Sequence, residues 1–102
     1  MYRAIAEINQ NSIVSNLNII KNIIKEKDII MAVVKANAYG FGLIPISSLL
    51  KEYGINYFAV SSIEEAIVLR KINPNCYILN LSKTFFEDLS IAVNNNLSLI
   101  HI

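Results

Sequence analysis

The hydrophobic positions follow two periods along the chain, one helical and one extended. Near the N-terminus, four large apolar residues have the spacing of one helical face, and they predict a helix from Asn11 or Ser12 to about Lys27. These residues are Ile13, Leu17, Ile20 and Ile24. A short extended segment is expected before this helix, over residues 3–8.

Four later segments are almost uniformly apolar and show no alternation. They cover residues 29–35, 57–61, 76–81 and 97–102. Such runs are typical of strands in a parallel sheet that is covered on both faces. Because the runs recur at intervals long enough for a helix, they are compatible with βαβ crossovers.

Helical signals separate these four strands. The first helix has Pro45 in its first turn, where the missing N–H costs nothing, and Gly54 is a good stop for it. The second opens with the capping box Ser62–Glu65 and ends at Asn73–Pro74. The third is expected over residues 86–93, closed by three asparagines.

Alternating strands and helices predict the α/β class, with parallel strands joined by crossover helices. A complete (β/α)8 TIM-type barrel has about 250 residues, so this chain of 102 residues has room for roughly the first half of one. Two interpretations follow: a small sheet that stands alone, or a part of a larger barrel.

The charge, the cysteine content and the N-terminal residues indicate which partners and which cell compartment to expect. The formal net charge is +1 and no block of basic residues occurs, so neither nucleic acid nor a membrane surface is an expected partner. The single Cys76 excludes an internal disulfide framework and fits a reducing compartment. Glu7 interrupts the apolar core that a signal peptide would need, and no apolar run is long enough to span a membrane. We therefore expect a cytoplasmic location.

One lysine is the last residue of the strand expected over residues 29–35. The other residues of that strand are apolar, as expected for a buried segment. Lys35 lies at the carboxyl end of that strand, the edge at which parallel α/β folds carry their chemistry. A partly desolvated lysine amine can form a Schiff base with an aldehyde such as pyridoxal phosphate. Gly40 and Gly42 permit tight turns near a ligand, and the hydroxyl of Tyr39 could donate to a phosphate. The alternative is an ordinary strand-end lysine that extends to water.

Several ordered segments resemble the alanine racemase family, which belongs to the fold-type III pyridoxal-phosphate enzymes. A-V-V-K-A-N-A-Y-G-F-G at residues 32–42 is similar to that family's cofactor-attachment motif, V-V-K-A-N/D-A-Y-G-H-G. F-A-V-S-S-I-E-E-A-I-V-L-R at residues 58–70 resembles the family's F-A-V-A-x-x-E-E-A-x-x-L-R segment. A-E-I-N at residues 6–9 and I-L-N-L at residues 78–81 also match, so the similarity extends along most of the chain.

The resemblance implies a function and a set of site residues. Residues 1–102 would be the N-terminal part of the racemase barrel domain, inactive alone because the rest of the barrel and a C-terminal β domain are absent. Members of the family interconvert L- and D-alanine for peptidoglycan synthesis. They use pyridoxal phosphate as cofactor and act as homodimers. Lys35 would bind the cofactor and act as a base on one face of the substrate, Tyr39 would bind the cofactor phosphate, and Leu81 would lie near the cofactor.

Two positions depart from the family's pattern, since Phe41 replaces its usual histidine and Asn9 replaces the aspartate of A-E-I-D. Two other functions stay open: a pyridoxal-phosphate-binding module without catalysis, and a truncated gene remnant.

A metal site is not expected, because His101 has no cluster of further ligands around it. Cys76 is expected to pack as a small apolar group, and Glu64 and Glu65 to complement a helix dipole.

Overall fold

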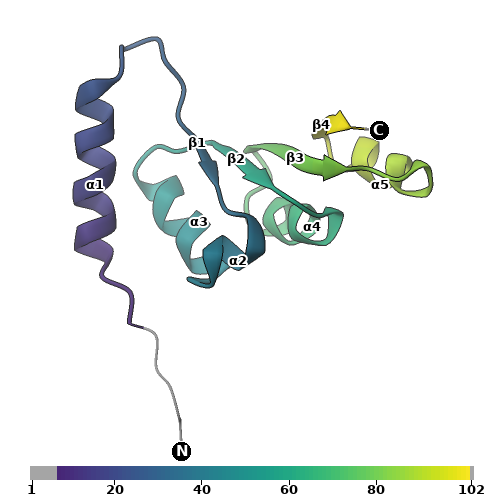
Figure 1. Cartoon of the computed structure of the whole chain (residues 1–102), viewed down its shortest axis with the longest axis horizontal. Helices are drawn as coiled ribbons and strands as arrows, with labels where there is room; N and C mark the ends of the chain where they lie inside the picture. The colour runs from purple at the N-terminus through teal and green to yellow at the C-terminus, as the bar shows by residue number, and fades with distance from the viewer. Residues whose placement is uncertain (1–6, 102) are drawn as a thin grey trace, which may run out of the picture.

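The computed structural model describes residues 7–101 as a parallel sheet with helices along one of its faces (Figure 1). The strands are β1 (Met31–Val33), β2 (Tyr57–Val60), β3 (Tyr77–Lys83) and β4 (Leu97–His101). The helical segments are α1 (Gln10–Ile23), α2 (Lys35–Tyr39), α3 (Leu43–Glu52), α4 (Ile63–Ile72), η1 (Phe86–Asp88, a 3-10 turn) and α5 (Leu89–Asn94).

The four strands lie side by side in chain order, β1-β2-β3-β4, and all three pairs are parallel. Since βαβ crossovers are right-handed, a sheet that always advances in one direction places its connecting helices on the same face. A doubly wound sheet would reverse its order and use both faces. The observed order is that of half a (β/α)8 barrel, and the predicted α/β class is confirmed.

The hydrophobic core lies between the sheet and the crossover helices. Its strand residues include Phe58, Val60 and Ile78, all fully buried, and helix α4 contributes Ala66 and Leu69, which are also fully buried. These residues alternate with others along each strand, so that one side of each strand faces the helices.

The opposite face of the sheet is largely open, which corrects the expectation of strands covered on both faces. Val33 is 42 % exposed, Tyr77 is 56 % exposed and Ile100 is 51 % exposed. The rings of Tyr57 and Tyr77, which are register partners on this face, stack with their centroids 4.6 Å apart. The uniform apolarity of the strands matches a sheet whose second face is the inside of a barrel, and the described residues line only part of it.

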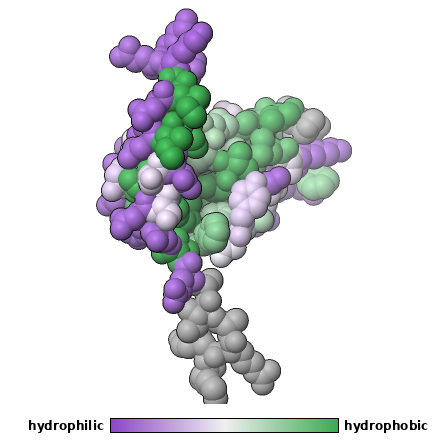
Figure 2. Space-filling model, turned by 60° about the vertical axis from the view of Figure 1, so that its left-hand side comes forward, coloured by the Kyte–Doolittle hydropathy of each residue, from purple (hydrophilic) through white to green (hydrophobic). Residues whose placement is uncertain are grey.

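Helix α1 stands at one side of the sheet and contributes one buried residue, Leu17 (Figure 1). Figure 2 shows hydrophobic surface running from α1 across the neighbouring part of the molecule. The helix begins earlier than predicted, because Asn9 and not Asn11 or Ser12 is the N-cap: its side-chain oxygen accepts from the Ser12 N–H at 3.1 Å. It also ends earlier, at Ile23. Between residues 7 and 101 no helix combines the length and apolarity that crossing a bilayer requires.

Most of the other predicted boundaries agree with the structure to within a few residues. The strand expected over 29–35 is shorter, because the chain turns directly after Val34, and the helix expected over 86–93 divides into η1 and α5. Residues 1–6 and 102 lie outside the described residues, and so does most of the extended segment expected over 3–8. Of that segment, Glu7 and Ile8 are described and belong to no strand.

Candidate functional site

Lys35 follows the first strand at the carboxyl edge of the sheet. The N–H of Val34 donates to the carbonyl of Ala59 at 2.8 Å, which extends the pairing of β1 with β2 by one residue. Val34 itself is only 2 % exposed, whereas Lys35 is half-buried. The backbone that leads into Lys35 is therefore held by the sheet, and Lys35 lies at the edge where active sites of this fold class are found.

Residues 36–39 of α2, directly after Lys35, form a left-handed turn. Ala36, Asn37, Ala38 and Tyr39 have φ between 52° and 55°, and the first three have ψ between 44° and 49°. Left-handed helical conformation costs an L-residue about 1–2 kcal/mol, and it is routinely visited only by glycine, asparagine and aspartate as single residues. Four successive residues of this kind require support from their surroundings.

Asn37 is the centre of the hydrogen bonds that hold this turn. Its backbone carbonyl accepts from the N–H of Gly40 at 3.2 Å and from that of Gly42 at 2.9 Å. Its side-chain Oδ1 accepts from the N–H of Leu43 at 2.8 Å, which satisfies a free donor at the start of α3. The turn, the two glycines and the start of α3 are thereby joined through one residue.

A carboxylate from the next βα unit also contacts the turn. Oε2 of Glu65 accepts from the N–H of Asn37 at 2.9 Å, and Oε1 accepts from the N–H of Ser61 at 3.3 Å and from its hydroxyl at 3.4 Å. The capping box is confirmed in part, because Ser62 Oγ accepts from the Glu65 N–H at 3.1 Å. The sequence predicted a role for Glu65 in the helix only, and the link to Asn37 carries no local signal because 28 residues separate the two.

The remaining predicted site residues lie at the same edge of the sheet. A helical turn of either hand brings residues four apart to the same side, about 6 Å along its axis, so the backbone of Tyr39 lies one turn from that of Lys35. Tyr39 is 61 % exposed. Leu81 lies near the end of β3 and is half-buried, and it alternates with the buried Asn80 and therefore belongs to the open face. Their roles toward a cofactor stay predictions.

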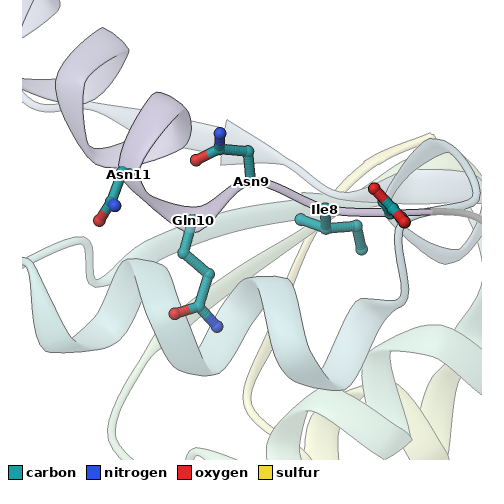
Figure 3. A pocket seen from close by; sticks show the side chains of 5 residues that line it. Ile8, Asn9, Gln10 and Asn11 are labelled. Carbon is teal, nitrogen blue, oxygen red and sulfur yellow. The ribbon is translucent and has the colours of Figure 1, made fainter.

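A cavity lies along this edge, beyond the carboxyl ends of β2 and β3. It is lined by Ser61, Ser62, Ile63, Glu64, Asn80, Ser82, Lys83, Phe85 and Asp88. Hydroxyl, carboxamide, ammonium and carboxylate groups therefore line a common space one strand away from Lys35. A separate, open concavity lies beside the segment of residues 7–11 at the start of α1 (Figure 3). It is lined by that one continuous segment and includes none of the predicted site residues.

The donor set at the edge fits pyridoxal phosphate in its chemistry. Lys35 supplies an amine for the aldehyde, and Tyr39 supplies a hydroxyl that can donate to a phosphate oxygen. The open face beside Leu81 provides an apolar surface for a planar ring. Lys35 and Tyr39 lie in α2, the segment that follows β1, and Leu81 lies in β3.

The other residues considered in the sequence have simpler environments. Cys76 is buried, its thiol donates to the carbonyl of Asn73 at 3.3 Å, and burial raises the pKa of that thiol above its ordinary value. A thiol of this kind packs as an apolar group, as predicted. Phe41 is exposed. The side chain of His101 lies outside the described residues.

Comparison with known proteins gives matches over nearly the whole chain. The family model described as "Alanine racemase, N-terminal domain" matches residues 8–100. Alanine racemase from Borreliella burgdorferi (strain ZS7) is 53 % identical over 72 residues, which are 71 % of this chain and 19 % of that protein.

Two solved structures show the same arrangement of elements. Alanine racemase from Clostridium difficile 630 in complex with cycloserine has a TM-score of 0.85 and 36 % identity, over 90 % of this chain and 24 % of that one. Histidine racemase from Leuconostoc mesenteroides has a TM-score of 0.79 and 34 % identity, over 88 % of this chain and 24 % of that one. The chain thus spans about a fifth to a quarter of the length of these relatives. With its lysine motif, its sheet order and these matches, the chain belongs to the alanine racemase family, in which it corresponds to an N-terminal portion.

Proposed function

We propose that the chain provides the cofactor-binding lysine of a pyridoxal-phosphate-dependent racemase that interconverts L- and D-alanine. The observation that carries this proposal is the position of Lys35, which is half-buried at the carboxyl edge of the sheet and followed at once by a hydrogen-bonded left-handed turn. An ordinary strand-end lysine needs no such turn, and the turn costs free energy.

Each site residue has a distinct part in the proposal. Bound pyridoxal phosphate supplies the electron sink that acidifies the α-proton of an amino acid. The Lys35 amine would hold the cofactor aldehyde, and once the amine of the substrate displaces it, the freed amine would move a proton at the substrate α-carbon, on one face. The Tyr39 hydroxyl donates to the cofactor phosphate, and Leu81 limits the space beside the ring.

Racemisation requires proton exchange on both faces of the α-carbon, and Lys35 serves only one of them. We place the second proton carrier outside the segment that this chain shares with its relatives, on the partner of a homodimer. The proposal therefore assigns to this chain one half of the proton chemistry. In bacteria the product D-alanine would supply cytoplasmic peptidoglycan synthesis.

Alanine is proposed as the substrate because the family model and most of the relatives described above carry its name. The histidine racemase among the similar structures indicates that the same scaffold can carry other amino acids. The experiment therefore compares alanine with histidine.

The first test is the site of covalent attachment. The chain is incubated with pyridoxal phosphate, reduced with borohydride and digested, and the modified lysines are quantified by mass spectrometry. We expect Lys35 to carry most of the label and the Lys35→Arg variant to lose it. Lys83→Arg is the matched control, because Lys83 also lies at the carboxyl end of a strand, is exposed and has its ammonium over the ring of Phe85. Equal labelling of Lys35 and Lys83 would refute the proposal.

The second test separates catalysis from cofactor binding alone. In deuterated water, one proton-transfer group suffices to exchange the α-hydrogen of the one alanine enantiomer whose α-hydrogen faces that group, without inverting it. We therefore expect the loaded chain to exchange the α-hydrogen of either L- or D-alanine faster than the Lys35→Arg variant or free pyridoxal phosphate does, and faster than that of the same enantiomer of histidine. Saturable binding without exchange would instead indicate a binding module.

A further inference from the structure

We propose that Glu65 is a positioning residue for Lys35, acting through the left-handed turn. This inference rests on the proposed function and extends it to a residue outside the lysine motif. The Glu65 carboxylate links two neighbouring βα units, because one oxygen accepts from Asn37, in the turn after β1, and the other accepts from Ser61, directly after β2.

The turn needs such an anchor because its own conformation is unfavourable. Residues 36–39 are all left-handed, and Ala36, Asn37 and Tyr39 are exposed, so packing contributes little to holding them. Of this turn only Ala38 is buried. A relaxed turn would redirect the backbone that leaves Lys35, and the amine would move with it. A hydrogen bond from a backbone N–H to a charged carboxylate is among the stronger ones available at a partly exposed site.

The contacts of Glu65 differ from those of an ordinary capping box. In that motif the glutamate at this position reaches back to the N–H of the N-cap residue, here Ser62. Glu65 instead accepts from the residue before the cap and from Asn37 in another unit. Helix capping alone therefore does not account for both of its carboxylate oxygens. The contact between units fixes the position of one strand end relative to the next at the edge where Lys35 lies.

Two variants of Glu65 and one neighbouring control separate positioning from charge and from capping. Glu65→Ala removes both acceptors. Glu65→Gln keeps one acceptor oxygen and replaces the other by a donor, so one of the two N–H groups loses its partner. Glu64→Gln changes the same charge in the same first turn of α4, at an exposed side chain without these bonds. Ser62→Ala removes the cap but leaves the carboxylate of Glu65 in place.

The main readout is the share of pyridoxal phosphate label that Lys35 receives relative to Lys83. The second readout, independent of the cofactor, is hydrogen exchange at the amide of Asn37. For Glu65→Ala we expect the preference for Lys35 to fall and exchange at Asn37 to accelerate about ten- to a hundredfold, since bonds to charged groups contribute that much to an opening equilibrium. Glu65→Gln should show a smaller change of the same kind. Glu64→Gln and Ser62→Ala should leave both readouts near the unmodified values, although Ser62→Ala lowers the thermal midpoint.

Each outcome either supports or refutes the positioning role of Glu65. If Glu65→Ala retains the Lys35 preference, or if Glu64→Gln loses it equally, positioning by Glu65 is refuted while the proposed function stands. Should Glu65→Ala fail to fold, unchanged preference and exchange in Glu65→Gln would refute it in the same way. If the unmodified chain shows no preference for Lys35, the proposed function itself fails, and this inference fails with it.

Discussion

At the scale of single residues, the most unusual feature of the chain is backbone handedness after Lys35. Ala36 and Ala38 are small, and Asn37 is the non-glycine residue type that best tolerates positive φ. Small side chains reduce the steric cost of the conformation without removing it. The remaining cost is offset by hydrogen bonds at Asn37. It accepts from the N–H groups of Gly42 and Leu43, and its own N–H donates to Glu65.

Replacement of Ala36 by glycine tests this strain directly. Ala36 is exposed and has φ of 52°, a region that glycine enters freely. The relief of about 1–2 kcal/mol exceeds the extra entropy that glycine loses on folding, about 0.5–1 kcal/mol. We expect Ala36→Gly to leave the free energy of unfolding unchanged or to raise it by up to about 1 kcal/mol, as measured by urea denaturation.

The control is Ser48→Gly, at an exposed position inside the right-handed helix α3. There glycine has no steric advantage, and we expect the free energy of unfolding to fall by about 0.5 kcal/mol. Destabilisation of about 1 kcal/mol by Ala36→Gly would contradict the presence of strain at residue 36.

At the scale of elements, Arg70 stabilises the amino-terminal edge of the sheet, opposite to the site. Its guanidinium lies at the end of α4 and donates to backbone carbonyls at the end of α5 and before β3, among them Asn95 at 2.9 Å and Cys76 at 2.6 Å. A further bond reaches Pro74 at 3.1 Å. Carbonyls at helix ends have no partner within their own helix, so one arginine satisfies groups from two separate connections.

Arg70→Ala should therefore destabilise the whole sheet. Several carbonyls would lose a charged donor, and we expect a loss of about 2–3 kcal/mol in the free energy of unfolding. Arg70→Lys should recover only part of this, because an ammonium cannot reproduce the planar fork. Lys71→Ala, at the exposed neighbouring position, should remain within about 0.5 kcal/mol of the unmodified chain. An equal effect of Arg70→Ala and Lys71→Ala in urea denaturation would exclude the role given to Arg70.

At the scale of the whole molecule, the sheet has one covered and one open face. The helices pack on Phe58, Val60 and Ile78, while the other face presents Val33 and Tyr77. Both faces are built from apolar residues, so the difference between them comes from what packs against each face.

Two valines on neighbouring strands test this difference with the same chemical change. Val60 is fully buried, and we expect Val60→Ala to lower the free energy of unfolding by about 2 kcal/mol, from the buried methyl groups and the cavity left behind. Val33 is 42 % exposed on the open face, and Val33→Ala should cost less than about 1 kcal/mol. Urea denaturation of both variants measures the difference. Equal losses would mean that the open face is covered in solution, by a second copy or another segment.

Much of the fold could be predicted from the sequence, because its signals act over a few residues. Ser62 caps α4 through a bond to a residue three positions away, and Gly54 adopts φ of 89° just after α3, as expected for a helix stop. The predicted start of α1 was wrong, because Asn9, Asn11 and Ser12 are all good N-cap residues and the local sequence does not select among them. At the site, Lys35 and Tyr39 were identified by motif, whereas the contact of Glu65 with Asn37 was not predicted.

The sequence by itself determined the alternation of strands and helices, the parallel α/β class and the lysine at a strand end, since periodicity and capping depend on neighbours along the chain. The tertiary structure alone decided which face of the sheet is covered, the left hand of residues 36–39 and the link from Glu65 to Asn37. These features depend on contacts between segments far apart in the chain, and a local pattern of apolar and polar residues carries no record of such contacts.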